Sequence, residues 1–140
     1  MGVVVDTSAF VDLERSSEPF EDALEDETAV LPAIVVAELL VGVQLARNTT
    51  LAARRRARID AITSRLPVIE FGLELAERWS ELFAALRRDG AVIPANDLVV
   101  AATATSIGYD VLVGRQDEAH FSRVPGLGVR TIGGNRGRAR

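Results

Sequence analysis

The sequence of 140 residues contains no cysteine, no lysine and a single histidine, His120. Without cysteine the chain has no disulfide, no thiol nucleophile and no cysteine-based zinc site, and one histidine cannot supply a cluster of histidine ligands. Without lysine it has no Schiff-base nucleophile and no P-loop lysine. If the chain is an enzyme, acids or hydroxyl groups must carry out its chemistry.

The sequence also lacks a stretch that is typical of a membrane-spanning helix. The longest apolar segment, residues 29–46, contains Pro32, Glu38 and Gln44, and a carboxylate near the centre of a span is costly. The N-terminus has no basic region and no myristoylation pattern, since Asp6 stands where serine or threonine is needed. We therefore expect a cytoplasmic protein.

Charge is distributed unevenly along the chain. Residues 1–46 contain ten acids and one arginine, whereas residues 47–140 contain ten acids and fifteen arginines. An isoelectric point of about 5.0 argues against nucleic-acid binding by the whole surface, but this asymmetry allows a local basic surface beside an acidic one.

The pattern of apolar residues predicts a single α/β domain with a mainly parallel central sheet of about four or five strands and helices on both faces. We expect this domain to cover residues 1–132, and the Gly- and Arg-rich tail, residues 133–140, to be disordered. The expected strands are residues 2–6, 29–31, 68–70, 109–113 and 128–132, and the expected helices are residues 8–15, 16–27, 32–47, 50–63, 72–89 and 98–107.

Asp6 directly follows the apolar run at residues 3–5 and precedes Thr7 and Ser8. Open α/β sheets bind their ligands at the ends of strands, so this carboxylate is a candidate for chemistry. An aspartate at a strand-to-helix turn is also a common structural residue, and Thr7 or Ser8 is placed to cap the next helix. Both interpretations stay open for this residue alone.

Glu38 lies on an expected helix among the apolar residues Ile34, Val41 and Leu45. Desolvation of an unpaired carboxylate costs several kcal/mol, so Glu38 must form a pair, become protonated or bind a cation. An ion pair with an arginine such as Arg47 is the simpler explanation.

Two further acids lie beside expected elements. Asp97 begins an almost wholly apolar helix, where N-capping alone would explain it, although the neighbouring Asn96 can cap instead. Asp117 follows the strand that ends at residue 113, and a lone acid in a loop ordinarily faces solvent. Together with Asp6, these acids are expected at one edge of the sheet, and a site made only of oxygen ligands suits Mg²⁺ or Mn²⁺ rather than zinc.

The order and spacing of these motifs resemble the PIN-domain nucleases over nearly the whole chain. Within that superfamily, the size, the helical hairpin after Glu38 and residues 120–127 are similar to the VapC toxins of bacterial toxin–antitoxin pairs. The motifs are Val-Val-Val-Asp-Thr-Ser at residues 3–8, Ala-Glu-Leu at 37–39, Asn-Asp-Leu-Val-Val-Ala-Ala-Thr at 96–103 and Val-Leu-Val at 111–113 with Asp117.

The resemblance implies a PIN-like nuclease domain over residues 1–132 and an Mg²⁺- or Mn²⁺-dependent endoribonuclease. In that family a quartet of acids holds the metal, and a nearby hydroxyl, here Thr7 or Ser8, would orient a bound water or phosphate. The implied catalytic and metal-binding acids are Asp6, Glu38, Asp97 and Asp117, and the supporting residues are Thr7, Ser8, Asn96 and Arg115.

The fourth acid is the point at which this sequence departs from the family pattern. The link from the strand to the acid, Gly114-Arg115-Gln116, is one residue longer than usual. We take Asp117 as the fourth acid because it lies four positions before Phe121, and Glu118 is the alternative.

The resemblance further implies an RNA substrate, a homodimer and a cognate VapB-type antitoxin that wraps the toxin and places a basic side chain in the acidic site. Apolar side chains within residues 10–24 and 35–45 are candidates for the antitoxin groove, although ordinary core is the simpler interpretation for most of them. The arginine run at residues 54–58 is a candidate guide for RNA phosphates, with Arg115 near the chemistry. A solvated helix face is the simpler interpretation of that run.

Two rival functions remain. A phosphatase of the haloacid-dehalogenase type also begins with an aspartate after a hydrophobic strand, but its second aspartate is replaced here by Ser8 and its lysine is absent. A non-catalytic PIN-like module that binds RNA or protein is the better rival, because degenerate nuclease domains exist. Cleavage of RNA that depends on a divalent metal would distinguish the enzyme from the module.

Overall fold

The computed structural model describes residues 2–115 and 118–133. Within this part of the chain, five strands form one parallel sheet in the order β3-β2-β1-β4-β5. The strands are β1 (Val3–Val5), β2 (Ala29–Pro32), β3 (Val68–Ile69), β4 (Asp110–Val113) and β5 (Val129–Thr131). The helices are α1 (Thr7–Arg15), α2 (Phe20–Ala23), α3 (Ala33–Gln44), α4 (Thr49–Arg65), α5 (Leu73–Arg88), α6 (Ala95–Ile107) and α7 (Glu118–Phe121).

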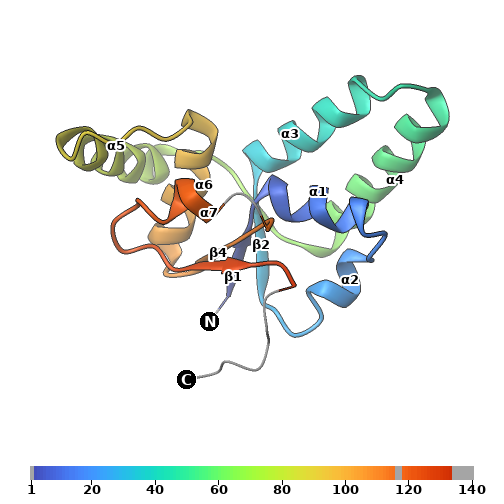
Figure 1. The fold of residues 1–140 in the computed structure, drawn as a ribbon, viewed down its shortest axis with the longest axis horizontal. Coiled ribbons are helices and arrows are strands. Elements are labelled where there is room, and N and C mark those ends of the chain that lie inside the picture. Colours follow the sequence, from blue (N-terminus) through green and yellow to red (C-terminus); the bar gives the residue numbers. More distant parts are fainter. Residues whose placement is uncertain (1, 116–117, 134–140) are drawn as a thin grey trace.

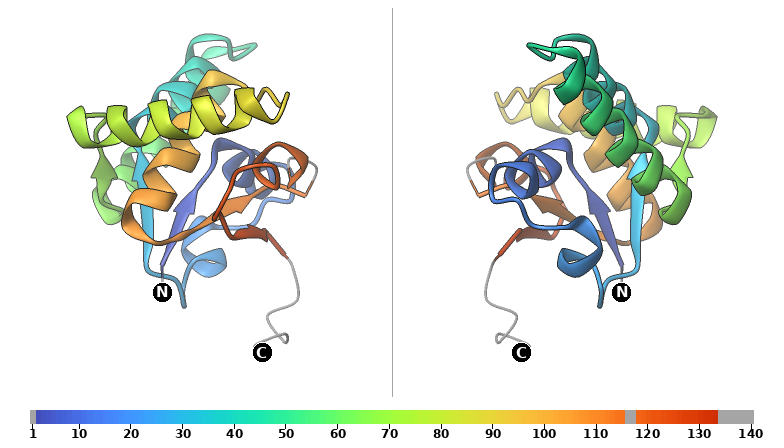
Figure 2. Two further views of the ribbon diagram at one scale, coloured as in Figure 1. Left: turned by 90° about the vertical axis from the view of Figure 1, so that its left-hand side faces the viewer. Right: turned by 90° about the vertical axis from the view of Figure 1, so that its right-hand side faces the viewer.

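Helices cover both faces of the sheet, as the sequence predicted. Figure 1 shows α5 and α6 on one side of the strands and α1, α2 and α4 on the other. The helices α3 and α4 form a hairpin that extends away from the sheet, and both views in Figure 2 place the tip of this hairpin and α5 above the sheet and α2 beside its lower end. No helix among residues 2–115 and 118–133 is long and apolar enough to span a membrane.

The strand β1 is the centre of the core. Its three valines are completely buried, and it pairs in parallel with β2 on one side and β4 on the other. A strand that is covered on both faces has no polar face, which is why the sequence there is a continuous apolar run. The helix α6 packs against β1 with small buried residues, among them Ala101, Ala102 and Ala104.

The strand order fixes where a ligand can bind. From β1 the chain passes outward through β2 to β3, and it then returns to place β4 on the other side of β1. Connections therefore leave the adjacent strands β1 and β4 in opposite directions. Such a switch in strand order leaves a crevice beyond the carboxyl ends of the two strands, where open α/β sheets bind their ligands.

The predicted helix over residues 16–27 is wrong, because only Phe20–Ala23 is helical there. The helix α1 ends in a turn in which Ser17 adopts a positive φ of 54°. Pro19 follows, and it has no amide hydrogen to continue a helical ladder and disfavours helix in the residue before it. In this segment the proline predicts the break in the helix better than the acidic composition predicts a continuous helix.

Predictions about the C-terminal end stay predictions. The expected disordered tail lies, apart from Gly133, outside the described residues. Ile132, which follows β5, is still part of the buried core at 6% exposed, and the boundary at residue 132 stays a prediction.

Phe10 on α1 is fully buried in the hydrophobic core, and replacing it should test how much the core depends on this helix. We expect Phe10→Ala to lower the free energy of unfolding by about 3–5 kcal/mol, because it removes a buried ring and leaves a cavity. Denaturant titration of the purified chain measures this. Phe71→Ala is the matched control, since Phe71 is 49% exposed, and equal losses in the two variants would contradict this packing.

Candidate active site

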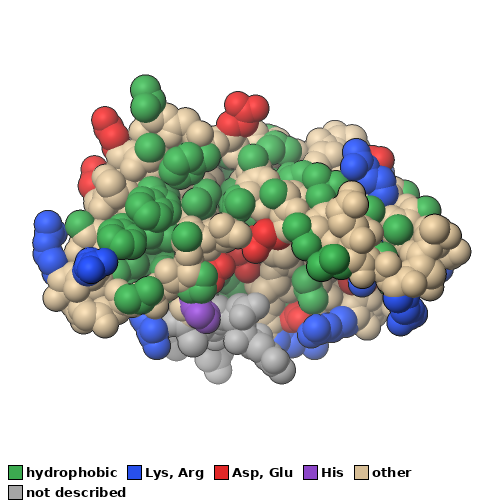
Figure 3. All heavy atoms as spheres, turned by 90° about the horizontal axis from the view of Figure 1, so that it is seen from above, with side chains coloured by type: hydrophobic (Ala, Val, Ile, Leu, Met, Phe, Trp, Pro, Cys, Tyr) green, Lys and Arg blue, Asp and Glu red, His purple; other side chains and the backbone are tan. Residues whose placement is uncertain are grey.

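A cavity of about 640 Å³ opens beyond the carboxyl ends of β1 and β4. Figure 3, which views the molecule from above, shows acidic side chains near the centre of this face between hydrophobic side chains. Four carboxylates and two guanidinium groups line the cavity, contributed by segments far apart in the sequence. The lining residues are Asp6, Thr7, Ser8, Val11, Asp12, Arg15, Ser16, Glu38, Asp97, Gly114, Arg115 and Phe121.

Asp6 is buried at the end of β1, where its backbone amide still donates to the carbonyl of Leu112 at 2.9 Å. Its Oδ2 accepts from the amide of Ser8 at 3.1 Å and from the Ser8 hydroxyl at 2.6 Å. Asp6 is therefore the N-cap of α1, and the prediction that Thr7 or Ser8 caps this helix is wrong. The Asp6 carboxylate caps α1 and also lines the cavity.

Glu38 is half-buried on α3 and accepts a hydrogen bond from the Thr7 hydroxyl on α1 at 2.8 Å. The alternative that Arg47 pairs with Glu38 is wrong, because α3 ends at Gln44 and Arg47 lies exposed in the turn beyond it. The hydroxyls of Thr7 and Ser8 each donate to a carboxylate, so in this arrangement they hold the acids in position.

Asp97 lies in the first turn of α6 and lines the cavity with a side chain that is 25% exposed. It does not cap the helix, since Pro94 occupies the N-cap position, and a carboxylate in the first turn is favoured by the helix dipole. Nδ1 of His120 lies 3.8 Å from Asp97 Oδ2. Asn96 is exposed and lies outside the cavity.

The segment that leaves β4 is held against α1 by two hydrogen bonds from its backbone amides to side chains of α1. The Gly114 amide donates to the Ser8 hydroxyl oxygen at 2.9 Å, and the Arg115 amide donates to Asp12 Oδ2 at 2.7 Å. Asp117, the predicted fourth acid, lies outside the described residues. The alternative, Glu118, begins α7, and the structure does not describe its side chain.

Asp12 and Arg15 line the cavity but were not predicted as site residues. A signal for Asp12 was present in the sequence, because it lies four residues after Ser8 and therefore on the same face of α1. Arg15 follows after about one more turn, and with Arg115 it places positive charge at the acidic cavity. Arginine at these positions can bind phosphate.

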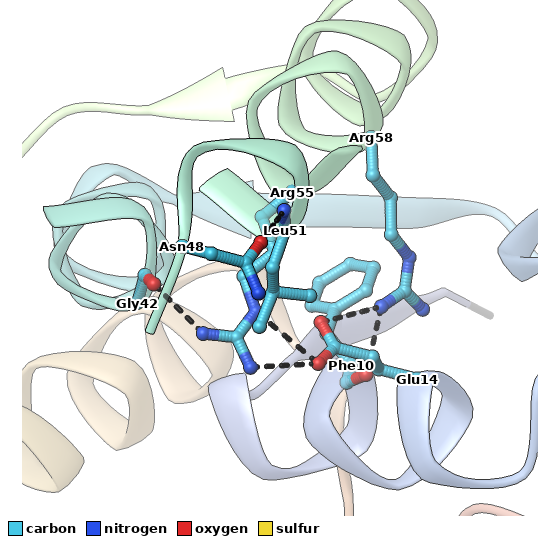
Figure 4. Close-up of polar contacts among 7 residues, drawn as sticks. All are labelled: Phe10, Glu14, Gly42, Asn48, Leu51, Arg55 and Arg58. Atoms are coloured by element: carbon cyan, nitrogen blue, oxygen red, sulfur yellow. Dashed lines mark hydrogen bonds and ion pairs between the residues drawn. The ribbon is translucent and has the colours of Figure 1, made fainter. Parts of the chain in front are cut away.

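The arginine run at residues 54–58 is used largely within the protein. Arg55 and Arg58 turn inward to contact α1 (Figure 4), while Arg56 pairs with Asp60 on its own helix at 3.2 Å. Burial lowers the pKa of the Arg58 guanidinium below its ordinary value, against the opposing effect of Glu14 and Glu21. The proposed role in guiding RNA therefore rests on fewer arginines than the sequence suggested.

The donor set of the cavity fits a hard divalent cation. Apart from Arg15 and Arg115, its polar side chains are carboxylates and hydroxyls, and the charge of four carboxylates exceeds that of the two arginines. Among the side chains that the structure describes, in residues 2–115 and 120–133, no three of His, Cys, Asp or Glu are close enough to hold one ion by themselves. Mg²⁺ does not need such a cage, because it usually keeps several waters and is bound by one or two carboxylates.

The PIN domain family matches residues 3–127 of this chain. The chain belongs to the PIN domain family. The match includes β1, β4 and each of the acids Asp6, Glu38 and Asp97.

Relatives within the PIN domain family confirm the resemblance to VapC proteins. Ribonuclease VapC1 of Rickettsia felis is 30% identical over 132 residues, which cover 94% of this chain and 97% of the relative. Ribonuclease VapC5 of Mycobacterium tuberculosis is 32% identical over 118 residues, which cover 83% of this chain and 84% of the relative. The similarity therefore extends over nearly the whole PIN domain.

Solved structures give the same result. The crystal structure of VapBC-5 from Mycobacterium tuberculosis, a member of the VapBC family of toxin-antitoxin systems, contains a chain with 28% sequence identity and a TM-score of 0.71. The match covers 94% of this PIN domain chain and 97% of that one.

Gly114 should tolerate no side chain, because α1 approaches its backbone closely. A Cβ atom there would lie 2.6 Å from the backbone oxygen of Ser8 and 3.1 Å from Asp12 Oδ2. We expect Gly114→Ala to lower the free energy of unfolding by about 1–3 kcal/mol, the usual cost of overpacking. Denaturant titration would show this, and Gly72→Ala, which meets no atom within 4 Å, should have a small effect; a neutral Gly114→Ala would contradict the close contact.

Proposed function

We propose that this chain is a divalent-metal-dependent endoribonuclease and the toxin of a toxin–antitoxin pair. The observation that carries the proposal is the convergence of Asp6, Glu38 and Asp97, from three separate elements, on one cavity at the switch in strand order. The similarity to proteins named Ribonuclease VapC supports RNA as the substrate.

The charge of the cavity supports the requirement for metal. An RNA phosphodiester is an anion, and the cavity that would receive it contains an excess of carboxylates over arginines. Repulsion would oppose binding unless a cation reversed the local charge. Asp6 and Asp97 are the residues that we propose hold the ion, with Glu38 and Asp117 or Glu118 contributing directly or through water.

When bound, such an ion lowers the pKa of a water that attacks the phosphorus and stabilises negative charge on the phosphate. The protein's own residues prepare this site. Ser8 fixes the rotamer of Asp6 by its hydrogen bond, and Thr7 does the same for Glu38. Arg15 and Arg115 would bind the phosphates on either side of the cleaved bond.

An antitoxin of the VapB type is the proposed partner, supported by the similarity to a chain from a toxin–antitoxin structure. Five apolar residues of the predicted groove are buried core, namely Phe10, Leu13, Phe20, Leu24 and Val35. Val11, Val41 and Leu45, in contrast, remain 38%, 52% and 78% exposed. These three side chains are where the partner would contact α1 and α3. The homodimer stays a prediction from the resemblance, and the cytoplasmic location stays a prediction from the sequence.

The nuclease hypothesis predicts which single changes abolish activity without unfolding the chain. Asp6→Asn and Asp97→Asn should reduce RNA cleavage in Mg²⁺ or Mn²⁺ by about 100-fold or more, since each removes a charge that acts at the reacting phosphate. The amide oxygen of asparagine can still accept from Ser8, so circular dichroism should show a folded Asp6→Asn variant. Gel assays with labelled RNA measure the rates.

Asp60→Asn is the matched control, because Asp60 is exposed on α4 and pairs only with Arg56 among the described ion pairs. Its cleavage rate should equal that of the wild type. Metal binding by the wild type with no cleavage of any RNA tested would instead favour the non-catalytic module. The same assay on Asp117→Asn and Glu118→Gln decides which acid completes the site, since only one of the two should lose activity.

A further inference from the structure

The position of Glu38 raises the question of what holds this part of α3 in place. Glu38 is the one predicted acid on the α3–α4 hairpin, which extends away from the sheet (Figure 1). The buried residue of α3 is Val35, and the helix beyond it is half-buried or exposed. Core packing therefore fixes the first turn of α3 most firmly. Glu38 lies about one turn further along, where partly buried side chains such as Leu39 pack against the core.

Among the hydrogen bonds described for residues 2–115 and 118–133, those of the Arg55 guanidinium join the outer part of α3 to α1. Arg55 on α4 donates through Nη1 to the Gly42 carbonyl of α3 at 2.8 Å. It also donates through Nε and Nη2 to Glu14 Oε1 of α1, at 3.2 Å and 2.9 Å. Figure 4 shows this side chain between the three helices.

This link and the Thr7–Glu38 hydrogen bond run alongside each other. Gly42 lies about one turn after Glu38 on α3, and Glu14 lies about two turns after Thr7 on α1. The two helices are thus joined near Glu38 directly and beyond it through Arg55. Without the outer link, the outer part of α3 would be held by its partly buried packing alone, and a small shift of the helix would move Glu38 relative to the cavity.

Arginine is chemically suited to join two helices in this way. Its planar group presents donors in a fixed fork, so one side chain can satisfy a carbonyl and a carboxylate at the same time. The Arg55 side chain is 30% exposed, and hydrogen bonds to a charged acceptor are stronger than neutral ones. Arg58 adds contacts to Phe10 and Glu14, but both lie on α1 and neither reaches α3.

We propose that Arg55 is a positioning residue for Glu38, which acts by holding the outer part of α3 against α1. This proposal rests on the proposed ribonuclease function. It assigns Arg55 a role different from the phosphate guide that the arginine run suggested, because all three of its nitrogens already donate to protein atoms. Arg55 would touch neither RNA nor metal.

The test compares Arg55→Ala with Arg56→Ala in the full chain. Both changes remove an arginine from α4, but the hydrogen bond and ion pair described for Arg56 join it to Asp60 on the same helix. We expect Arg55→Ala to lower kcat for RNA cleavage roughly 10- to 100-fold, the effect of a small misplacement of a catalytic group, with KM unchanged. Arg56→Ala should leave kcat within about twofold, as expected for a surface residue.

Two further measurements separate positioning from charge. Arg55→Lys retains the positive charge but not the fork, so its kcat should stay nearer to that of Arg55→Ala than to the wild type. In the absence of RNA and metal, hydrogen exchange at the amides of residues 38–44 should be faster in Arg55→Ala than in Arg56→Ala. If Arg55→Ala proves unfolded by circular dichroism, Arg55→Lys replaces it with the same predictions.

A wild-type kcat in Arg55→Ala, or a raised KM with unchanged kcat, would overturn the proposal and leave the ribonuclease function in place. Full recovery of kcat by Arg55→Lys would also overturn it, since charge alone would then be sufficient. If the wild type cleaves no RNA, the ribonuclease function fails instead. The hydrogen-exchange comparison then still tests whether Arg55 holds α3 against α1. Equal exchange rates at residues 38–44 in Arg55→Ala and Arg56→Ala would contradict this role.

Discussion

The crowding of carboxylates at the carboxyl ends of β1 and β4 is the constraint on which the rest of the site depends. Asp6, Asp12, Glu38 and Asp97 line one cavity, and like charges at such a site repel each other unless hydrogen bonds, cations or a metal compensate. The protein supplies part of this compensation itself. Hydroxyls donate to two of these acids and a backbone amide to a third, and two arginines line the same cavity.

These compensating contacts also hold the fold together around the cavity. The Ser8 hydroxyl donates to Asp6 and accepts from Gly114, so one side chain joins the ends of β1 and β4 to the start of α1. Thr7 joins α1 to α3, and Arg55 joins α1, α3 and α4 further from the sheet. Among the described carboxylates that line the cavity, α1 thus carries or contacts the segments of Asp6, Asp12 and Glu38, and Asp97 on α6 is the exception.

Local patterns predicted the fold better than they predicted the site's contacts. The buried run at residues 3–5 and the apolar helix containing Asp97 follow from composition and periodicity, and both are present. The partner of Glu38 could not be predicted, because Thr7 is 31 residues away in sequence and reaches Glu38 only after two helices pack. For the same reason the arginine run gave no indication that Arg55 faces inward while Arg56 faces solvent.

The central claim is that the acidic cavity binds the divalent ion required for RNA cleavage. X-ray diffraction from crystals of the full chain soaked in Mn²⁺ tests it most directly, because the anomalous signal of manganese locates the ion without assumptions about the protein. The account predicts a peak in bonding contact with the carboxylates of both Asp6 and Asp97. A cavity with no peak, at Mn²⁺ concentrations that support cleavage, would contradict it.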